Sequence, residues 1–341
     1  MIPHGVRLEQ NKSAILKRGI CDVPGPEGLP APASFAPVRR EADPRRILAA
    51  AEAAGICDET DGASLREKLE TLAKRKTDLL VAFCFDDDPF SACEQAVLRA
   101  DPEKIADGLA LAAKACRAKE TLIAAASRRE IRRMVSQGVK TPAVTAGERY
   151  PAEFFLLRRL RRRGKETAFL GAQACAALSD AVRKGLPQSK TVVTVAGDGA
   201  AECGNFRVRI GMTLEAVLNA AGADSRSQFV AVGPAMTGRS IRDLTMPVTA
   251  ATRCVTVMKK GPRHRTFPCV RCGRCAGVCP VGIVPWLVHR ELESGSPEPL
   301  LLFHVGECIG CRACDAVCPS DIELAEEVKR AAALKEGGRT V

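Results

Sequence analysis

The chain has 341 residues, of which 46% are hydrophobic and only 4% aromatic, and its formal net charge is +11. This composition excludes a disordered chain and indicates a globular protein of two or three domains. No apolar run approaches the ~18 residues that a membrane span needs. The first residues lack the basic and apolar regions of a signal peptide, so we expect a cytoplasmic protein.

The first two segments of the chain differ in composition. Residues 1–42 are rich in proline and glycine and predict a short segment that is irregular or contains only short strands. From Asp43-Pro44, a helix cap followed by proline, helical patterns alternate with short apolar runs. This alternation predicts an α/β domain with a largely parallel sheet over 43–189. Its expected helices cover 43–55, 64–76, 101–118, 128–137 and 172–184, and its expected strands 78–85, 121–126 and 167–170.

Residues 158–165 form a dense basic patch with six Arg or Lys side chains. Such a patch attracts nucleic acid or acidic proteins. Here no aromatic residue is interleaved, and Phe154, Phe155, Leu156, Leu157 and Leu160 form an adjoining apolar face. We therefore predict a solvated helix face and no nucleic-acid partner.

Residues 190–250 predict a second, smaller module. A β-branched strand, a Gly-Asp-Gly turn and an alternating strand are followed at once by a helix with Thr213 as its cap. A hairpin followed by a helix indicates a β-grasp-like fold. The turn at 197–199 lacks the third glycine of a dinucleotide fingerprint, which favours a plain turn. The expected strands cover 191–196 and 205–210, and the expected helix 214–221.

Cysteines dominate the last predicted domain, residues 261–330. Two runs follow C-x₂-C-x₂-C-x₃-C-P without deviation, and they contain Cys269, Cys272, Cys275 and Cys279, then Cys308, Cys311, Cys314 and Cys318. This spacing is typical of [4Fe–4S] ligands, and the fourth cysteine of each run ligates the other cluster in two-cluster ferredoxins. The runs predict one cluster on Cys269, Cys272, Cys275 and Cys318, and a second on Cys308, Cys311, Cys314 and Cys279.

Cysteines can also bind zinc or serve as small core side chains. Zinc also takes four thiolates, but its sites usually combine two separated C-x₂-C pairs, so complete four-cysteine runs favour clusters. The other eight cysteines have no mutual ligand spacing, and we expect small buried side chains, with a third cluster left open. They are Cys21, Cys57, Cys84, Cys93, Cys116, Cys175, Cys203 and Cys254.

The order of these modules resembles the C subunit of the Rnf electron-transport complex, itself similar to the flavin-carrying subunit of respiratory complex I. His4-Gly5 with Asn11-Lys12 resembles the opening segment of that family. Residues 191–249 resemble its SLBB module, a soluble-ligand-binding β-grasp, and the double cysteine run follows at the expected place. The resemblance implies a parallel α/β layer, then an SLBB module, then an α-helical dicluster ferredoxin domain.

The same resemblance associates the α/β domain with flavin and NADH, but three motifs depart from the family. The glycine-rich loop is replaced by residues 57–65, which contain one glycine and three acids that oppose phosphate binding. The family's Asn is Phe83, and its Gly-Gly-Glu after Tyr150-Pro151 is replaced by residues 152–155. We therefore expect two [4Fe–4S] clusters and no FMN, with chemistry of its own on NADH doubtful.

Three functions follow as hypotheses. The first is an electron-transfer subunit that relays electrons between redox proteins, such as a ferredoxin, a reductase or an Rnf-type membrane complex, on the cytoplasmic face of the membrane. The second is a working NADH dehydrogenase subunit with flavin in a divergent pocket. The third is an assembly factor whose clusters only stabilise the fold.

Overall fold

The computed structural model describes residues 8–25, 32–38, 43–147, 149–162, 164–223, 229–234, 236–261, 265–295 and 304–337. The chain divides into two units, one built from Arg7–Pro234 and Arg239–Lys260, the other mainly from Gly261–Val341. His4-Gly5, quoted above for the family's opening segment, lies outside the described residues.

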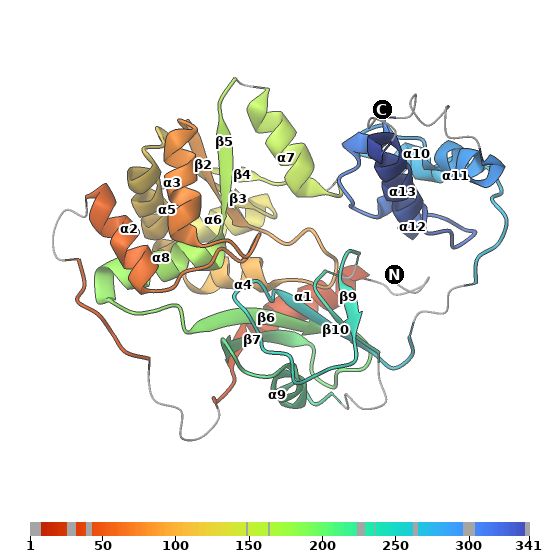
Figure 1. The fold of residues 1–341 in the computed structure, drawn as a ribbon. Coiled ribbons are helices and arrows are strands. Elements are labelled where there is room, and N and C mark those ends of the chain that lie inside the picture. The colour runs from red at the N-terminus through yellow and green to blue at the C-terminus, as the bar shows by residue number, and fades with distance from the viewer. Residues whose placement is uncertain are drawn as a thin grey trace. The chain divides into compact units, whose positions relative to one another are not determined.

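The first unit contains a four-stranded, wholly parallel sheet, as predicted (Figure 1). Its strand order is β4-β3-β2-β5, where the strands are β2 (Leu79–Cys84), β3 (Glu120–Ala125), β4 (Ala143–Thr145) and β5 (Thr167–Gly171). The chain runs outward from β2 to β4 and then returns to the other side of β2. The carboxyl ends of β2 and β5 therefore form the topological switch point, where open α/β sheets commonly bind ligands.

Helices cover both faces of this sheet. They are α2 (Pro44–Ala53), α3 (Leu65–Lys74), α4 (Cys93–Ala100), α5 (Pro102–Cys116), α6 (Arg128–Ser136), α7 (Ala152–Arg161) and α8 (Ala172–Lys184). One core joins α2, α3, α5 and α8 to alternate residues of β2, including Leu80 and Ala82. The other face of β2, with Val81 and Phe83, packs against Leu156 and Leu160 of α7. The alternation follows from the period of two in a strand.

The predicted helix ends have local causes. Asp43 accepts a hydrogen bond from the backbone N–H of Arg46 at 2.9 Å, which caps α2 before Pro44. Leu65, Leu69 and Leu72 of α3 are buried on one face. The basic patch lies at the end of α7, where Arg158, Arg159 and Arg161 are exposed, as expected for a solvated face.

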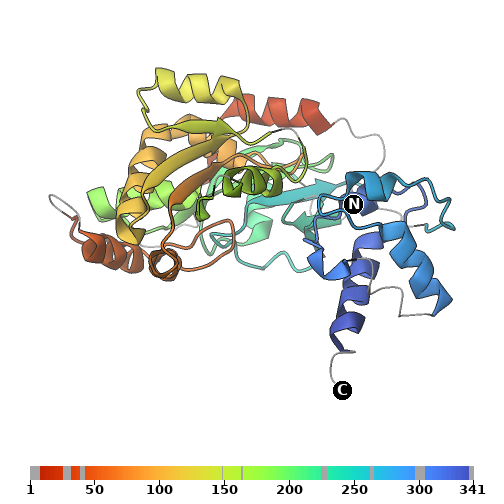
Figure 2. The ribbon, with the colours of Figure 1, turned by 90° about the horizontal axis from the view of Figure 1, so that it is seen from above.

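The expectation of an irregular or short-stranded segment over 1–42 is wrong where the chain forms a helix. Residues Leu8–Arg18 form the helix α1, and Ile20–Asp22 form the strand β1. Ile15 is 1% exposed, so α1 packs against the unit through this apolar side chain. Figure 2 shows α1 in red and α6 in yellow beside each other along one edge of the unit.

A mixed six-stranded sheet completes the first unit. Its order is β1-β7-β6-β10-β8-β9, and the further strands are β6 (Lys190–Ala196), β7 (Gly204–Arg209), β8 (Phe229–Val232), β9 (Arg239–Ile241) and β10 (Cys254–Met258). β6 and β7 form the predicted antiparallel hairpin, and Thr213 caps α9 (Leu214–Ala220) by accepting from Ala216 N–H at 3.3 Å. The SLBB assignment stays a prediction. The structure groups the predicted domains 43–189 and 190–250 in one compact unit.

The second unit is helical around the cysteines. It contains α10 (Arg274–Val278), α11 (Pro285–Ser294), the 3₁₀ turn η2 (Val305–Glu307), α12 (Ala313–Ala316) and α13 (Leu324–Gly337). Ile283, Val288, Val305, Val328 and Ala331 form a small core that joins α11 to α13. Across the described part of both units, no helix combines the length and the apolar character that crossing a membrane requires.

Candidate functional site

The two cysteine runs adopt the same local structure. In each run two cysteines precede a short helix, the third lies inside it and the fourth follows its end. Gly273 before α10 and Arg312 before α12 both have positive φ, 72° and 59°, so both loops turn in the same way into the helix. The repeat of spacing in the sequence is therefore a repeat of structure.

The fold brings the fourth cysteine of each run beside the other run. Cys318, 8% exposed, packs in one core with Cys275 and the partly buried Cys269 and Cys314. Cys279 and Cys308 pack together against the core of α11 and α13. One cavity is lined by the four thiols that the sequence assigns to the second cluster, Cys279, Cys308, Cys311 and Cys314. This arrangement fits the predicted crossed ligation.

Among the residues that the structure describes, no three His, Cys, Asp or Glu side chains converge on a point that a single metal ion would occupy. A tetrahedral zinc needs four ligands around one ion, whereas the ligands of a cubane are held apart by the cluster between them. Burial raises the pKa of the Cys311 thiol, and the nearby Cys279 and Cys308 raise it further.

Most of the other cysteines are packing residues, as predicted. Five are buried, namely Cys84, Cys93, Cys116, Cys175 and Cys254, while Cys57 and Cys203 are half-buried. The expectation of burial is wrong for Cys21, which is exposed on β1, an edge strand of the mixed sheet.

The switch point between β2 and β5 is filled by carboxyl groups. Glu59 is 2% exposed and accepts hydrogen bonds from the backbone N–H groups of Gln173 at 2.6 Å and Ala174 at 2.9 Å. Asp58 accepts from Gly171 N–H at 3.2 Å, and Glu94 from Ala172 N–H at 3.2 Å. These four donors are the N–H groups that a helix N-terminus offers to an anion. The chain's own acids therefore occupy the anion site of α8.

Gly171 permits this arrangement. A Cβ atom at this position would lie 2.0 Å from Glu59 Oε1 and 2.1 Å from its Cδ. Its φ of −68° is accessible to any residue, so steric space rather than backbone conformation requires glycine here.

A second layer of charged groups supports the first. Arg253, which immediately precedes β10, forms ion pairs with Asp86 at 3.4 Å and Glu94 at 3.2 Å. Lys68 of α3 pairs with Asp58 at 2.7 Å. Four buried carboxyl groups thus share two cations. Burial, followed by the charges of Glu94 and Asp58, raises the pKa of Glu59 well above its ordinary range.

The other two motifs that depart from the flavin-binding pattern also have structural roles. Phe83 is 2% exposed, and its ring packs on Phe85 with centroids 4.1 Å apart. Asp87 accepts hydrogen bonds from Ala152 N–H at 2.9 Å and Glu153 N–H at 3.1 Å, which caps α7. An aromatic core and a second capped helix therefore stand where the resemblance to the Rnf C subunit implies polar cofactor contacts.

These residues do not fit an FMN phosphate at the switch point. The donors are already used, and a phosphate would meet a buried group with more carboxyls than cations. The sequence predicts the repulsion from the acids of residues 57–65. It does not predict Glu94, Asp86 or Arg253, because no local pattern marks residues that meet only in the fold.

Comparison with known proteins identifies the cysteine-rich segment. The family model described as "4Fe-4S dicluster domain" matches residues 268–322. The C subunit of the ion-translocating oxidoreductase complex of Rhodobacter capsulatus is 28% identical over 281 residues, which is 75% of this chain and 54% of that protein. The resemblance to the Rnf C subunit is confirmed.

Other relatives agree with this result. The C subunit of the proton-translocating ferredoxin:NAD(+) oxidoreductase complex of Clostridium ljungdahlii is 24% identical over 280 residues, 76% of this chain and 60% of that protein. A chain of an NAD⁺-reducing [NiFe]-hydrogenase in the H₂-reduced state has a TM-score of 0.58 at 18% identity, covering 88% of this chain and 58% of that one. This likeness shows the fold alone. The chain spans little more than half the length of these relatives.

Proposed function

We propose that this chain is an iron–sulfur electron-transfer subunit that relays electrons between partner proteins through two [4Fe–4S] clusters. The observation that supports the proposal is the position of the fourth cysteines, with Cys318 packed beside residues of the first run and Cys279 beside Cys308 of the second. When bound, each cluster would take up and release one electron. Crossed ligands hold two clusters close together, which suits a relay and is an unusual way merely to stabilise a fold.

The proposal includes the absence of FMN from the α/β domain. This absence is supported by Glu59, Asp58 and Glu94, which accept hydrogen bonds from the backbone N–H groups of α8 that a phosphate would use. Electrons would then arrive from a protein partner instead of a flavin in the same chain. A ferredoxin, a reductase or a membrane complex of the Rnf type would serve, with the chain peripheral on the cytoplasmic face. The contrasting proposal is an NADH dehydrogenase subunit that binds FMN elsewhere.

Composition of the purified protein tests the proposal. After anaerobic purification we expect about eight irons and eight sulfides per chain and no flavin. Replacement of Cys272 by Ala should remove or damage one cluster and lower the iron content to about four. The matched control Cys21→Ala removes an exposed thiol outside the runs and should retain about eight irons. Stoichiometric FMN, or an unchanged iron content in Cys272→Ala, would refute the corresponding part of the proposal.

A further inference from the structure

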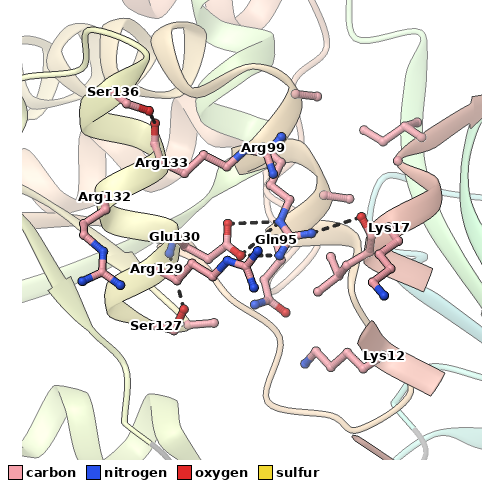
Figure 3. A pocket seen from close by; sticks show the side chains of 16 residues that line it. Lys12, Lys17, Gln95, Arg99, Ser127, Arg129, Glu130, Arg132, Arg133 and Ser136 are labelled. Atoms are coloured by element: carbon pink, nitrogen blue, oxygen red, sulfur yellow. Dashed lines mark hydrogen bonds and ion pairs between the residues drawn. The ribbon is translucent and has the colours of Figure 1, made fainter. Parts of the chain in front are cut away.

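The first unit contains a large cavity away from the capped N-terminus of α8 (Figure 3). Its volume is about 1370 Å³, and residues of α1, α4, α6 and the loop after β3 line it. Lys12 Nζ, on its wall, donates to the backbone carbonyl groups of Asp86 at 2.6 Å and Asp88 at 3.2 Å, just beyond β2. The cavity thus lies at the carboxyl ends of β2 and β3, the edge at which parallel sheets commonly bind ligands.

The charge of the cavity is strongly positive and mostly uncompensated. The cationic residues that line it are Lys12, Lys17, Arg99, Arg129, Arg132 and Arg133. Glu130 is the one carboxylate among the described lining residues. It forms an ion pair with Arg99, whose Nε lies 3.1 and 3.0 Å from the two carboxylate oxygens. Within the described part of the chain, the side chains of Lys17, Arg129, Arg132 and Arg133 form no hydrogen bond or ion pair. Figure 3 shows the side chains of Arg129 and Arg133 running toward Arg99 and Gln95, while that of Arg132 points away from them.

A buried polar group supplies a second, independent observation. Gln95 of α4 lines the cavity and is only 6% exposed. Its Oε1 atom has no hydrogen-bond partner among the described residues. A buried amide oxygen without a partner is costly, so it indicates a donor that a ligand would bring.

We propose that this cavity binds a small organic phosphate. Its phosphate groups would lie among Lys17, Arg129 and Arg133, because a guanidinium group donates two parallel hydrogen bonds to phosphate oxygens. A hydroxyl or amino group of the same molecule would donate to Gln95 Oε1. The first turn of α6, which also lines the cavity, adds its positive helix end.

The basic end of α7 is a surface with the same kind of charge but no cavity. Arg158 and Arg161 are exposed there, as Arg129 and Arg133 of α6 are, but the lining of the cavity includes neither of them. At the cavity, cations from α1 and α6 meet around a hollow that contains a buried unpartnered amide. This contrast favours a small ligand and provides a matched control.

The test uses the full chain with its clusters loaded and measures binding by calorimetry at about 50 mM salt. Inorganic pyrophosphate probes the cationic part, and ADP adds hydroxyl and amino donors. Both should bind, and Arg129→Gln with Arg133→Gln should raise both Kd values by about tenfold or more. Gln95→Leu should raise the Kd of ADP about threefold to tenfold and leave that of pyrophosphate within about twofold.

The control Arg158→Gln with Arg161→Gln removes the same charge and should change neither Kd by more than about twofold. Iron content and cluster absorbance should be the same in all variants, so that failure of this proposal is separate from failure of the relay. No binding of either probe at millimolar concentration would overturn the proposal. An equal loss in the α7 control would overturn it as well, because it would show general attraction to a basic protein.

Discussion

Replacement of Gly171 by Ala tests whether Glu59 occupies the N-terminus of α8. The new Cβ atom would lie 2.0 Å from Glu59 Oε1, far inside van der Waals contact, so the carboxyl group must move. It would then lose its hydrogen bonds from Gln173 N–H and Ala174 N–H. Each buried N–H group left without a partner costs about 1–3 kcal/mol, so we expect Gly171→Ala to lower the free energy of unfolding by about 3 kcal/mol or more.

A double-mutant cycle isolates this contact. In a Glu59→Ala background the side chain that Gly171→Ala displaces is absent, and φ of −68° suits alanine. There the substitution should be neutral or stabilise the protein by about 0.4–1 kcal/mol. The assay is urea unfolding followed by circular dichroism, with the slope m unchanged among the four proteins. A cost below about 1 kcal/mol in the parent, or an equal cost in both backgrounds, would refute the reasoning.

Three further predictions concern the clusters, the buried acids and the packing of helices. Cys318→Ala should damage the same cluster as Cys272→Ala, so that the double variant keeps about four irons; loss of both clusters in the double variant would contradict the crossed assignment. Burial and the charge of Glu94 raise the pKa of Glu59 in the folded protein. Protonated Glu59 therefore contributes fully to the free energy of unfolding below about pH 4.3, and this contribution is lost as the pH rises through the pKa of the folded state. In Glu59→Gln the urea midpoint should therefore fall less between pH 4.5 and pH 8. If it falls as much as in the parent protein, the pH dependence comes from other groups. Gly108→Ala would place a Cβ atom 1.8 Å from a backbone oxygen of α8, so α5 and α8 must separate. We expect the free energy of unfolding to fall by at least about 3 kcal/mol in the same urea assay. A fall below about 1 kcal/mol would show that the two helices can move apart at little cost.

Local signals explain what could be predicted from the sequence. The run Leu79–Cys84 is buried at every position, and such runs indicate a central parallel strand without further context. Asp43 and Thr213 cap their helices through side chains three residues from their partners. The cysteine runs combine spacing and chemistry, which is why the second unit could be described before its fold was known.

Contacts between distant residues explain what the sequence did not predict. Glu59 meets α8 across 114 residues, and Arg253 meets Asp86 across 167. The acids of residues 57–65 indicate repulsion of phosphate, but only the fold shows that Glu59 takes its place. The helix α1 was missed because the prolines and glycines that mark 1–42 as irregular all lie outside Leu8–Arg18. The cavity at Gln95 likewise depends on three helices.

The central claim is that the clusters are the redox centres of this chain and that no flavin supplies them. It is tested most directly by adding NADH to the anaerobic, cluster-loaded protein while its visible absorbance is followed. We expect no bleaching with NADH and complete bleaching with dithionite. Bleaching by NADH alone at a rate comparable to turnover of an NADH dehydrogenase would contradict the account.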